Sequence, residues 1–381
     1  MHIFTLNDSI SSIHQRALSL SISKDFADQQ YGKVNLVDHQ GSEQENRRRE
    51  LLNVEKEAQQ EKIVAAYGEE HFRNQVTNTF YQQVRSQINK DFDNKTHLYH
   101  NVLCIEDAAP AILELLSLRA TSINKIQPLS SSLPWLAKDL ISLVNKPQYR
   151  KRDDVKVTDA KLALSYVGLD NLKLVMPTFI LKHWLPNSTA PFTLMKRKLW
   201  NDSLSIALAA AALAKEAKID WYTAFTTGML SNIGQLAVTR CFLETYNDIY
   251  LKTVRNAVEV KDKVLHNVLV KIDNSPELLL EQLTLRSTSL SADLIEIMKF
   301  DRLPITVPMF DLAYGENIDD MSPVAQVVAK AKVYVNYRSL TKANLINKNE
   351  IIPLFNTVKL TKKELSLLSK SDIDHIKLKF N

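Results

Sequence analysis

The spacing of hydrophobic positions predicts a helical protein over most of the chain. Between residues 102 and 336, apolar side chains recur every three or four positions, and Pro110, Pro128, Pro134 and Pro147 mark breaks between the segments. Residues 204–217 are almost entirely alanine and leucine on one side, which favours close packing inside a bundle. We therefore predict an all-α fold with its core in this region.

The first 42 residues differ from this pattern. Apolar and polar residues alternate over residues 18–22 and again over residues 34–36, and polar spacers separate the two runs. Alternation is typical of a strand whose two faces have different surroundings. We therefore expect an N-terminal arm, flexible or with a minor β element, at residues 1–42.

Residues 43–101 predict a charged helical extension, because this segment is free of proline and rich in charge. Its apolar side chains recur at every fourth position over residues 72–88, and a helical break is expected near Gly68. A fourfold spacing winds slowly around a helix, so the stripe should cross its neighbour at an angle. That geometry favours docking on the body of the protein over a coiled coil.

The last part of the chain, residues 337–381, predicts a C-terminal extension with one short helix and a basic tail. Thr361 and Glu364 have the spacing of a capping box at the start of that helix. Residues 340–381 hold eight lysines and four acidic residues, whereas the whole chain has a net charge of +5. Such a mild excess disfavours nucleic acid as a partner, because phosphate binding needs cations clustered on one face.

Composition narrows the class of protein further. The 381 residues are 45% hydrophobic, contain only Cys104 and Cys241 as cysteines, and include no stretch of 18 uncharged apolar residues. These features predict a cytoplasmic protein without a membrane span, whose helical body occupies residues 102–336. The nine histidines are scattered, and neither a zinc motif nor a glycine-rich phosphate loop occurs, so no cofactor is expected.

Four segments in order resemble the HDOD family, the HD-related output domain of bacterial signalling proteins. They are a leucine-rich helix that ends at Asn145, a helix that ends in Val-Gly at Gly168 where the family has Leu-Gly, the Leu-Trp-Asn-Asp-Ser segment around Trp200, and residues 224–234 with Gly228 and Gly234. The resemblance implies an HD-like helical bundle over residues 102–336. It also implies that these glycines, Asn145 and Trp200 are structural positions.

The departures from the HD pattern bear on function. In HD phosphohydrolases, a histidine on one helix and a His-Asp pair on another hold a divalent ion that activates water against a phosphate ester. Asp202 stands in the place of that first histidine, and Ser231 with Asn232 replaces the pair. The resemblance therefore implies no metal and no catalytic residue. Asp202, Ser231 and Asn232 form a hydrogen-bonded polar cluster, or are simply polar groups on helix surfaces, or form a vestigial pocket for a small ligand or a peptide.

Our preferred hypothesis from the sequence is a non-catalytic regulatory module that binds an unknown signalling protein or a small ligand, and homo-oligomers are compatible with it. The alternative is a divergent metal-dependent phosphohydrolase that acts on a nucleotide or a phosphoester. Nucleic-acid binding through the lysine-rich tail ranks third.

Overall fold

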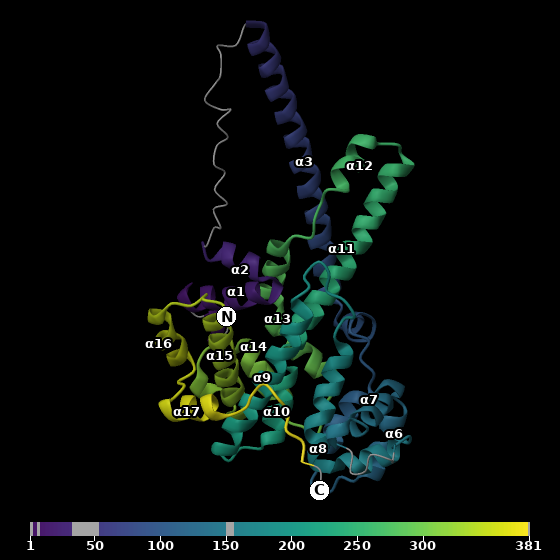
Figure 1. Cartoon of the computed structure of the whole chain (residues 1–381), viewed down its shortest axis with the longest axis vertical. Coiled ribbons are helices and arrows are strands. Elements are labelled where there is room, and N and C mark those ends of the chain that lie inside the picture. Colours follow the sequence, from purple (N-terminus) through teal and green to yellow (C-terminus); the bar gives the residue numbers. More distant parts are fainter. Residues whose placement is uncertain (1–2, 6–7, 33–52, 150–155, 380–381) are drawn as a thin grey trace.

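The protein is all-α in the part of the chain that the computed structural model describes, residues 3–5, 8–32, 53–149 and 156–379. Figure 1 shows a broad body from which long helices project at one end. The α-helices are α1 (Asp8–Ile22), α2 (Lys24–Gln30), α3 (Asn53–Asp93), α4 (Lys95–His97), α5 (Ala108–Ser117), α6 (Ile123–Ser131), α7 (Pro134–Val144), α8 (Ala160–Trp184), α9 (Met195–Glu216), α10 (Trp221–Leu230), α11 (Ile233–Glu259), α12 (Lys263–Leu269), α13 (Pro276–Ile297), α14 (Thr306–Tyr314), α15 (Pro323–Lys342), α16 (Lys348–Thr357) and α17 (Lys362–Lys370). Across these described residues, none of the helices has the length and apolar character needed to cross a lipid bilayer.

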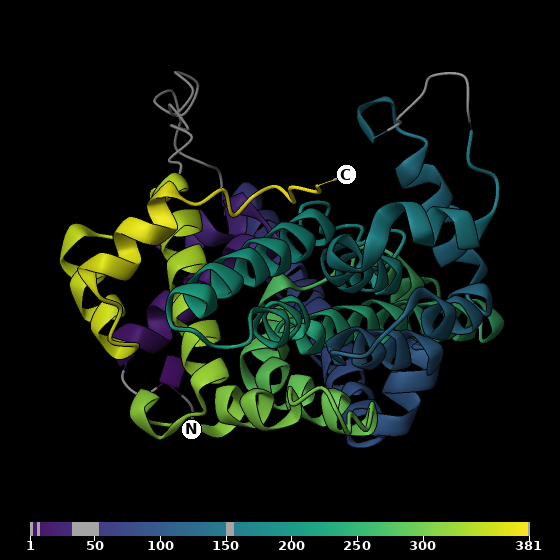
Figure 2. The ribbon, with the colours of Figure 1, turned by 90° about the horizontal axis from the view of Figure 1, so that it is seen from below.

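The alanine-rich helix α9 lies at the centre of the body, against α10 and α15 (Figure 2). Small side chains bring these helices close together. A Cβ added to Gly228 on α10 would lie 2.9 Å from the Cα of Ala207 on α9. Helix α11 pairs with α13 beside this group, and α8 packs against α5, α6 and α7. The predicted helical body at residues 102–336 is therefore built on a centre where backbones approach closely.

The β element expected in the N-terminal arm is wrong for residues 18–22, which form the last turns of helix α1. The polar and the apolar residues at 18–22 are all buried, so their alternation does not distinguish an exposed face of α1 from a buried one. The Ser19 hydroxyl donates to the Gln15 carbonyl at 2.9 Å, and the Ser21 hydroxyl donates to the Leu18 carbonyl at 2.6 Å. Because the helix itself satisfies these hydroxyls, they are buried at low cost. The other run, residues 34–36, lies outside the described residues.

Helix α1 is joined to the body by a buried arginine. The Arg16 guanidinium donates to the Leu345 carbonyl at 2.8 Å and pairs with the Glu350 carboxylate on α16 at 2.6 Å. The Glu350 carboxyl has a lowered pKa, because its hydrogen bonds to Arg16 and to the Asn347 amide outweigh the opposing effect of burial. The N-terminal segment therefore packs between the core and the C-terminal helices.

Helix α3 runs without a break through Gly68, where the sequence predicts one. A single glycine costs a helix only about 1 kcal/mol, and no proline accompanies it. The stripe docks as expected, because Phe80, Val84 and Ile88 are buried where α3 lies against α11 and α13. The other end of α3 projects from the body, next to the hairpin of α11 and α12 (Figure 1).

The C-terminal segment after α17 crosses the body and ends beside α8 (Figures 1 and 2). Helix α17 begins with the predicted capping box of Thr361 and Glu364. Further along, the Asn171 side chain holds the backbone of Lys379, with one bond from its amide to the Lys379 carbonyl at 2.8 Å and one from the Lys379 N–H at 3.0 Å. The described part of the C-terminal segment is therefore fixed to the helical body at Lys379.

Candidate functional site

Asp202 lies on α9 at the edge of a cavity of about 1020 Å³, which is also lined by α15 and by the C-terminal segment. Its carboxylate is 3.6 Å from the Lys198 ammonium, one helical turn earlier. Burial raises the pKa of the Asp202 carboxyl, and Lys198 opposes that shift. The structure therefore places Asp202 on the wall of a cavity, in contact with a cation.

Ser231 and Asn232 are buried where α10 ends and α11 begins. The Lys332 ammonium, on α15, donates to the Asn232 side-chain oxygen at 3.1 Å and to the Ser231 carbonyl at 3.3 Å. The Asn232 amide reaches the Ser203 hydroxyl at 3.5 Å, and the Ser231 carbonyl also accepts from Ser291 at 3.3 Å. This polar cluster of Ser203, Ser231, Asn232, Ser291 and Lys332 is held together by hydrogen bonds.

Lys332 is a member of this cluster that was not among the site residues expected from the sequence. Its exposed fraction is only 7%, and burial lowers the pKa of its ammonium to about 8. The signal was present in the sequence, because Lys332 stands inside the apolar run at residues 324–335 that predicts a buried helix. A lysine there must either extend its ammonium to the surface or find acceptors inside the protein. The structure shows the second outcome.

The three residues that the resemblance assigns to the HD ligand positions thus lie in two different places. Asp202 lines the cavity, whereas Ser231 and Asn232 belong to the polar cluster and do not line that cavity. Neighbouring residues on a helix point about 100° apart, so Ser203 reaches the cluster while Asp202 faces the cavity. These contacts do not favour the hypothesis of a single vestigial pocket that contains all three residues.

The cluster does not fit a divalent metal ion. Its oxygen donors are a carboxamide, a backbone carbonyl and hydroxyls, which are weaker ligands than imidazole and carboxylate. The Lys332 ammonium already occupies the Asn232 oxygen and the Ser231 carbonyl. Among the residues that the structure describes, three or more His, Cys, Asp or Glu side chains nowhere gather in a way that could hold a metal ion.

The family positions named from the sequence lie where close packing or a sharp bend is needed. Gly168 has φ 74° and ψ 158° and interrupts α8, and a positive φ of this kind favours glycine. A Cβ on Gly234 would meet the Ser287 carbonyl at 1.8 Å, so α11 and α13 touch at this point. Trp200 is half-buried against the core.

Asn145 fixes the two ends of the loop that follows α7. Its amide donates to the Val157 carbonyl at 2.6 Å and to the Ile141 carbonyl at 2.9 Å, and its oxygen accepts from the Val157 N–H at 3.0 Å. We expect Asn145→Ala to lower the free energy of unfolding by about 2 kcal/mol, because it removes three hydrogen bonds from partly buried groups. Urea denaturation measures the loss, and a cost below about 0.5 kcal/mol would contradict this structural role.

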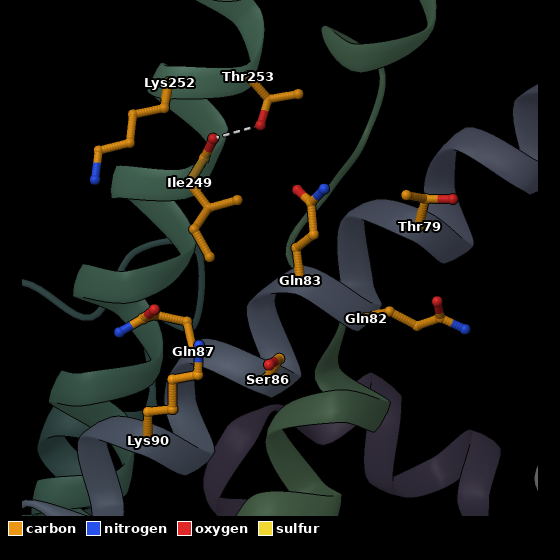
Figure 3. Close-up of a pocket in the computed structure, with 9 residues that line it drawn as sticks. All are labelled: Thr79, Gln82, Gln83, Ser86, Gln87, Lys90, Ile249, Lys252 and Thr253. Atoms are coloured by element: carbon orange, nitrogen blue, oxygen red, sulfur yellow. Dashed lines mark hydrogen bonds between the residues drawn. The ribbon is translucent and has the colours of Figure 1, made fainter.

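A second cavity, of about 520 Å³, lies between α3 and α11 (Figure 3). Its walls are mainly amide and hydroxyl side chains such as Gln83 and Gln87, and Lys90 and Lys252 are its charged residues. The Thr253 hydroxyl on this wall donates to the carbonyl of Ile249 at 2.8 Å. The lining of this second cavity contains none of Asp202, Ser231 and Asn232. The cavity beside Asp202 is therefore the stronger candidate for a functional site.

Comparison with known proteins agrees with the resemblance found in the sequence. Residues 104–276 match the model of the HDOD domain. Among solved structures, the chain is similar to a candidate phosphohydrolase from Shewanella amazonensis SB2B, with 17% identity, a TM-score of 0.44, and coverage of 72% of this chain and 92% of that one. It is also similar to a candidate signal transduction protein from Marinobacter aquaeolei VT8, with 15% identity, a TM-score of 0.40, and coverage of 74% and 67%. A search of curated proteins gives no match.

Proposed function

Because the chain carries an HDOD domain at residues 104–276, we propose that it is a non-catalytic regulatory module that acts by binding a signalling protein or a small ligand. The observation that carries this proposal is the Lys332 ammonium, bonded to Asn232 and to the carbonyl of Ser231. An internal cation stands beside the residues where HD enzymes hold their metal ion.

Metal-assisted hydrolysis needs an ion that polarises the phosphate and lowers the pKa of a bound water. To bind near Asn232, a divalent ion would have to displace the ammonium or its proton, and would gain only neutral oxygen donors in exchange. Asp202, the one carboxylate among the three HD positions, is paired with Lys198 at the cavity wall. The arrangement therefore supports a scaffold that binds without turnover.

A hydrolysis assay tests the proposal. The full-length chain is incubated with bis-p-nitrophenyl phosphate, and separately with ATP, in the presence of magnesium, manganese, nickel or zinc. We expect rates equal to those of metal and buffer alone, and the same rates for Asp202→Ala. Metal-dependent turnover that co-elutes with the protein, and that both Asp202→Ala and Asn232→Ala abolish, would favour a divergent phosphohydrolase instead.

A further inference from the structure

The cavity beside Asp202 has an excess of positive charge. Five cationic side chains line it, and two carboxylates, Asp202 and Asp374, oppose them; the cations are Lys24, Arg197, Lys198, Arg338 and Lys342. They come from α2, α9 and α15, segments far apart in the sequence that meet at this one place. A concave surface with one sign of charge concentrates ligands of the opposite sign.

Two of these cations are free to bind a ligand. Lys24 pairs with Asp28, Lys198 with Asp202, and Arg338 with Asp374. Arg197 and Lys342 have no hydrogen-bond or ion-pair partner among the residues that the structure describes. Their charges are therefore unneutralised at the edge of the cavity.

The C-terminal segment already places an anion in this cavity. The Asp374 carboxylate accepts from the Arg338 guanidinium at 2.7 and 3.3 Å, one bond to each oxygen, and from the Ser205 hydroxyl at 3.1 Å. These bonds lower the pKa of the Asp374 carboxyl, and the bond from Arg338 has the largest effect. An arginine fork beside a hydroxyl is also the arrangement that recognises a phosphate group.

The remaining walls and the size of the cavity fit an organic molecule better than a bare ion. Leu20, Leu194, Val335 and Tyr337 supply apolar and aromatic surface. The volume of about 1020 Å³ is at the upper end of the range of small-molecule sites, about 300–1,000 Å³. Inorganic phosphate would occupy only a small part of it.

We infer that this cavity binds a phosphate-bearing small molecule of nucleotide size, with Arg197 and Lys342 as its free cations and Asp374 as a competitor for Arg338. The inference rests on the proposed binding function and names the chemical class of its ligand. When the phosphate takes the Arg338 fork, Asp374 loses the guanidinium and keeps the Ser205 hydroxyl, and the contact between the C-terminal segment and α15 weakens. Binding and the position of this segment are therefore coupled.

Titration calorimetry of the full-length chain with ATP, pyrophosphate and inorganic phosphate, without added metal, tests the inference. We expect ATP to bind at one site, more weakly as salt rises, and more tightly than inorganic phosphate. The double variant Arg197→Gln/Lys342→Gln should bind ATP at least about tenfold more weakly, because two charge-assisted contacts are lost. Asp374→Asn should bind ATP about threefold or more tightly, because a carboxylate competitor is removed.

The matched control is Lys161→Gln/Arg255→Gln, which removes the same two charges from exposed positions on α8 and α11. Its ATP affinity should stay within about twofold of the unchanged chain, since neither residue lines the cavity. No ATP binding at millimolar concentration, an equal loss in the control, or weaker binding by Asp374→Asn would overturn the inference. Hydrolysis of the ATP would instead count against the proposed function, so the two failures are distinguishable.

Discussion

Gly234→Ala is expected to lower the free energy of unfolding by about 4 kcal/mol or more, or to prevent folding. The added Cβ would lie 1.8 Å from the Ser287 carbonyl and 2.7 Å from the Ser291 backbone nitrogen, both on α13. Helices α11 and α13 would have to separate. The Gly234 N–H would then lose its bond to the Ser291 hydroxyl, which is 2.9 Å long. Thermal and urea denaturation measure the change.

Gly68→Ala is the matched control for this substitution. Gly68 is exposed on the projecting part of α3, and a Cβ there would meet nothing within 4 Å. Alanine is the better helix former, so this variant should be more stable than the unchanged chain by about 0.5–1 kcal/mol. If Gly234→Ala stayed within about 1 kcal/mol of the unchanged protein, the close contact of α11 with α13 would be wrong.

The second large effect is a dependence of stability on pH that comes from Lys332. Its pKa is about 8 in the folded chain, and the ordinary value is 10.5. Between these values the unfolded chain keeps a proton that the folded chain has released, so the free energy of unfolding rises with pH across this window. Below pH 8 both states are protonated, and the folded state carries the full cost of the buried charge.

Lys332→Met should remove this rise. We expect the unchanged chain to gain about 2 kcal/mol relative to Lys332→Met between pH 7 and pH 9.5, measured by urea denaturation at each pH. Comparing the two chains cancels the titration of the groups they share. Lys332→Gln, which keeps a donor for Asn232, serves if the methionine variant folds poorly, and Lys161→Met is the exposed control. Parallel curves for the unchanged chain and Lys332→Met would contradict a buried ammonium.

The helical body could be predicted from the sequence because the spacing of its apolar residues and the order of its asparagine and glycine positions both indicate the same helical fold. The threefold and fourfold spacing predicts helices over residues 102–336, and the order of Asn145, Gly168, Gly228 and Gly234 indicates the family. The structure gives each of them a physical reason. Gly228 and Gly234 lie at close helix contacts, Gly168 has a positive φ where α8 bends, and Asn145 fixes a loop. Steric requirements of this kind leave a clear signature in residue type.

The N-terminal helix could not be predicted in this way. The alternation at residues 18–22 is typical of a strand, but α1 is covered on several sides by α9, α13, α15 and α16. Once a helix is covered in this way, its polar residues no longer identify an exposed face. The buried Arg16 that holds it pairs with Glu350, more than 300 residues later in the chain.

The sequence could not predict that Asp202 lies apart from Ser231 and Asn232 either. Asp202 and Ser203 are neighbours, and only the orientation of α9 decides which of them faces the cavity and which faces the interior. Lys332 comes from a helix 100 residues after Asn232, so its bond to that side chain depends on how α15 packs. The resemblance implies that Asp202, Ser231 and Asn232 replace the HD ligands, and the structure adds which side chains lie beside these three residues.

We propose that the Lys332 ammonium, and not a metal ion, accompanies Asn232 and Ser231. Its most direct test is the metal content of the purified full-length chain after incubation with manganese, nickel, zinc or magnesium and removal of loosely bound ions, measured by elemental mass spectrometry at pH 7. We predict less than about 0.1 equivalent of any metal, with no difference between the unchanged chain, Asn232→Ala and Asp202→Ala. One equivalent of metal that both substitutions remove, bound with release of a proton from Lys332, would show that this site holds a metal ion instead of the ammonium.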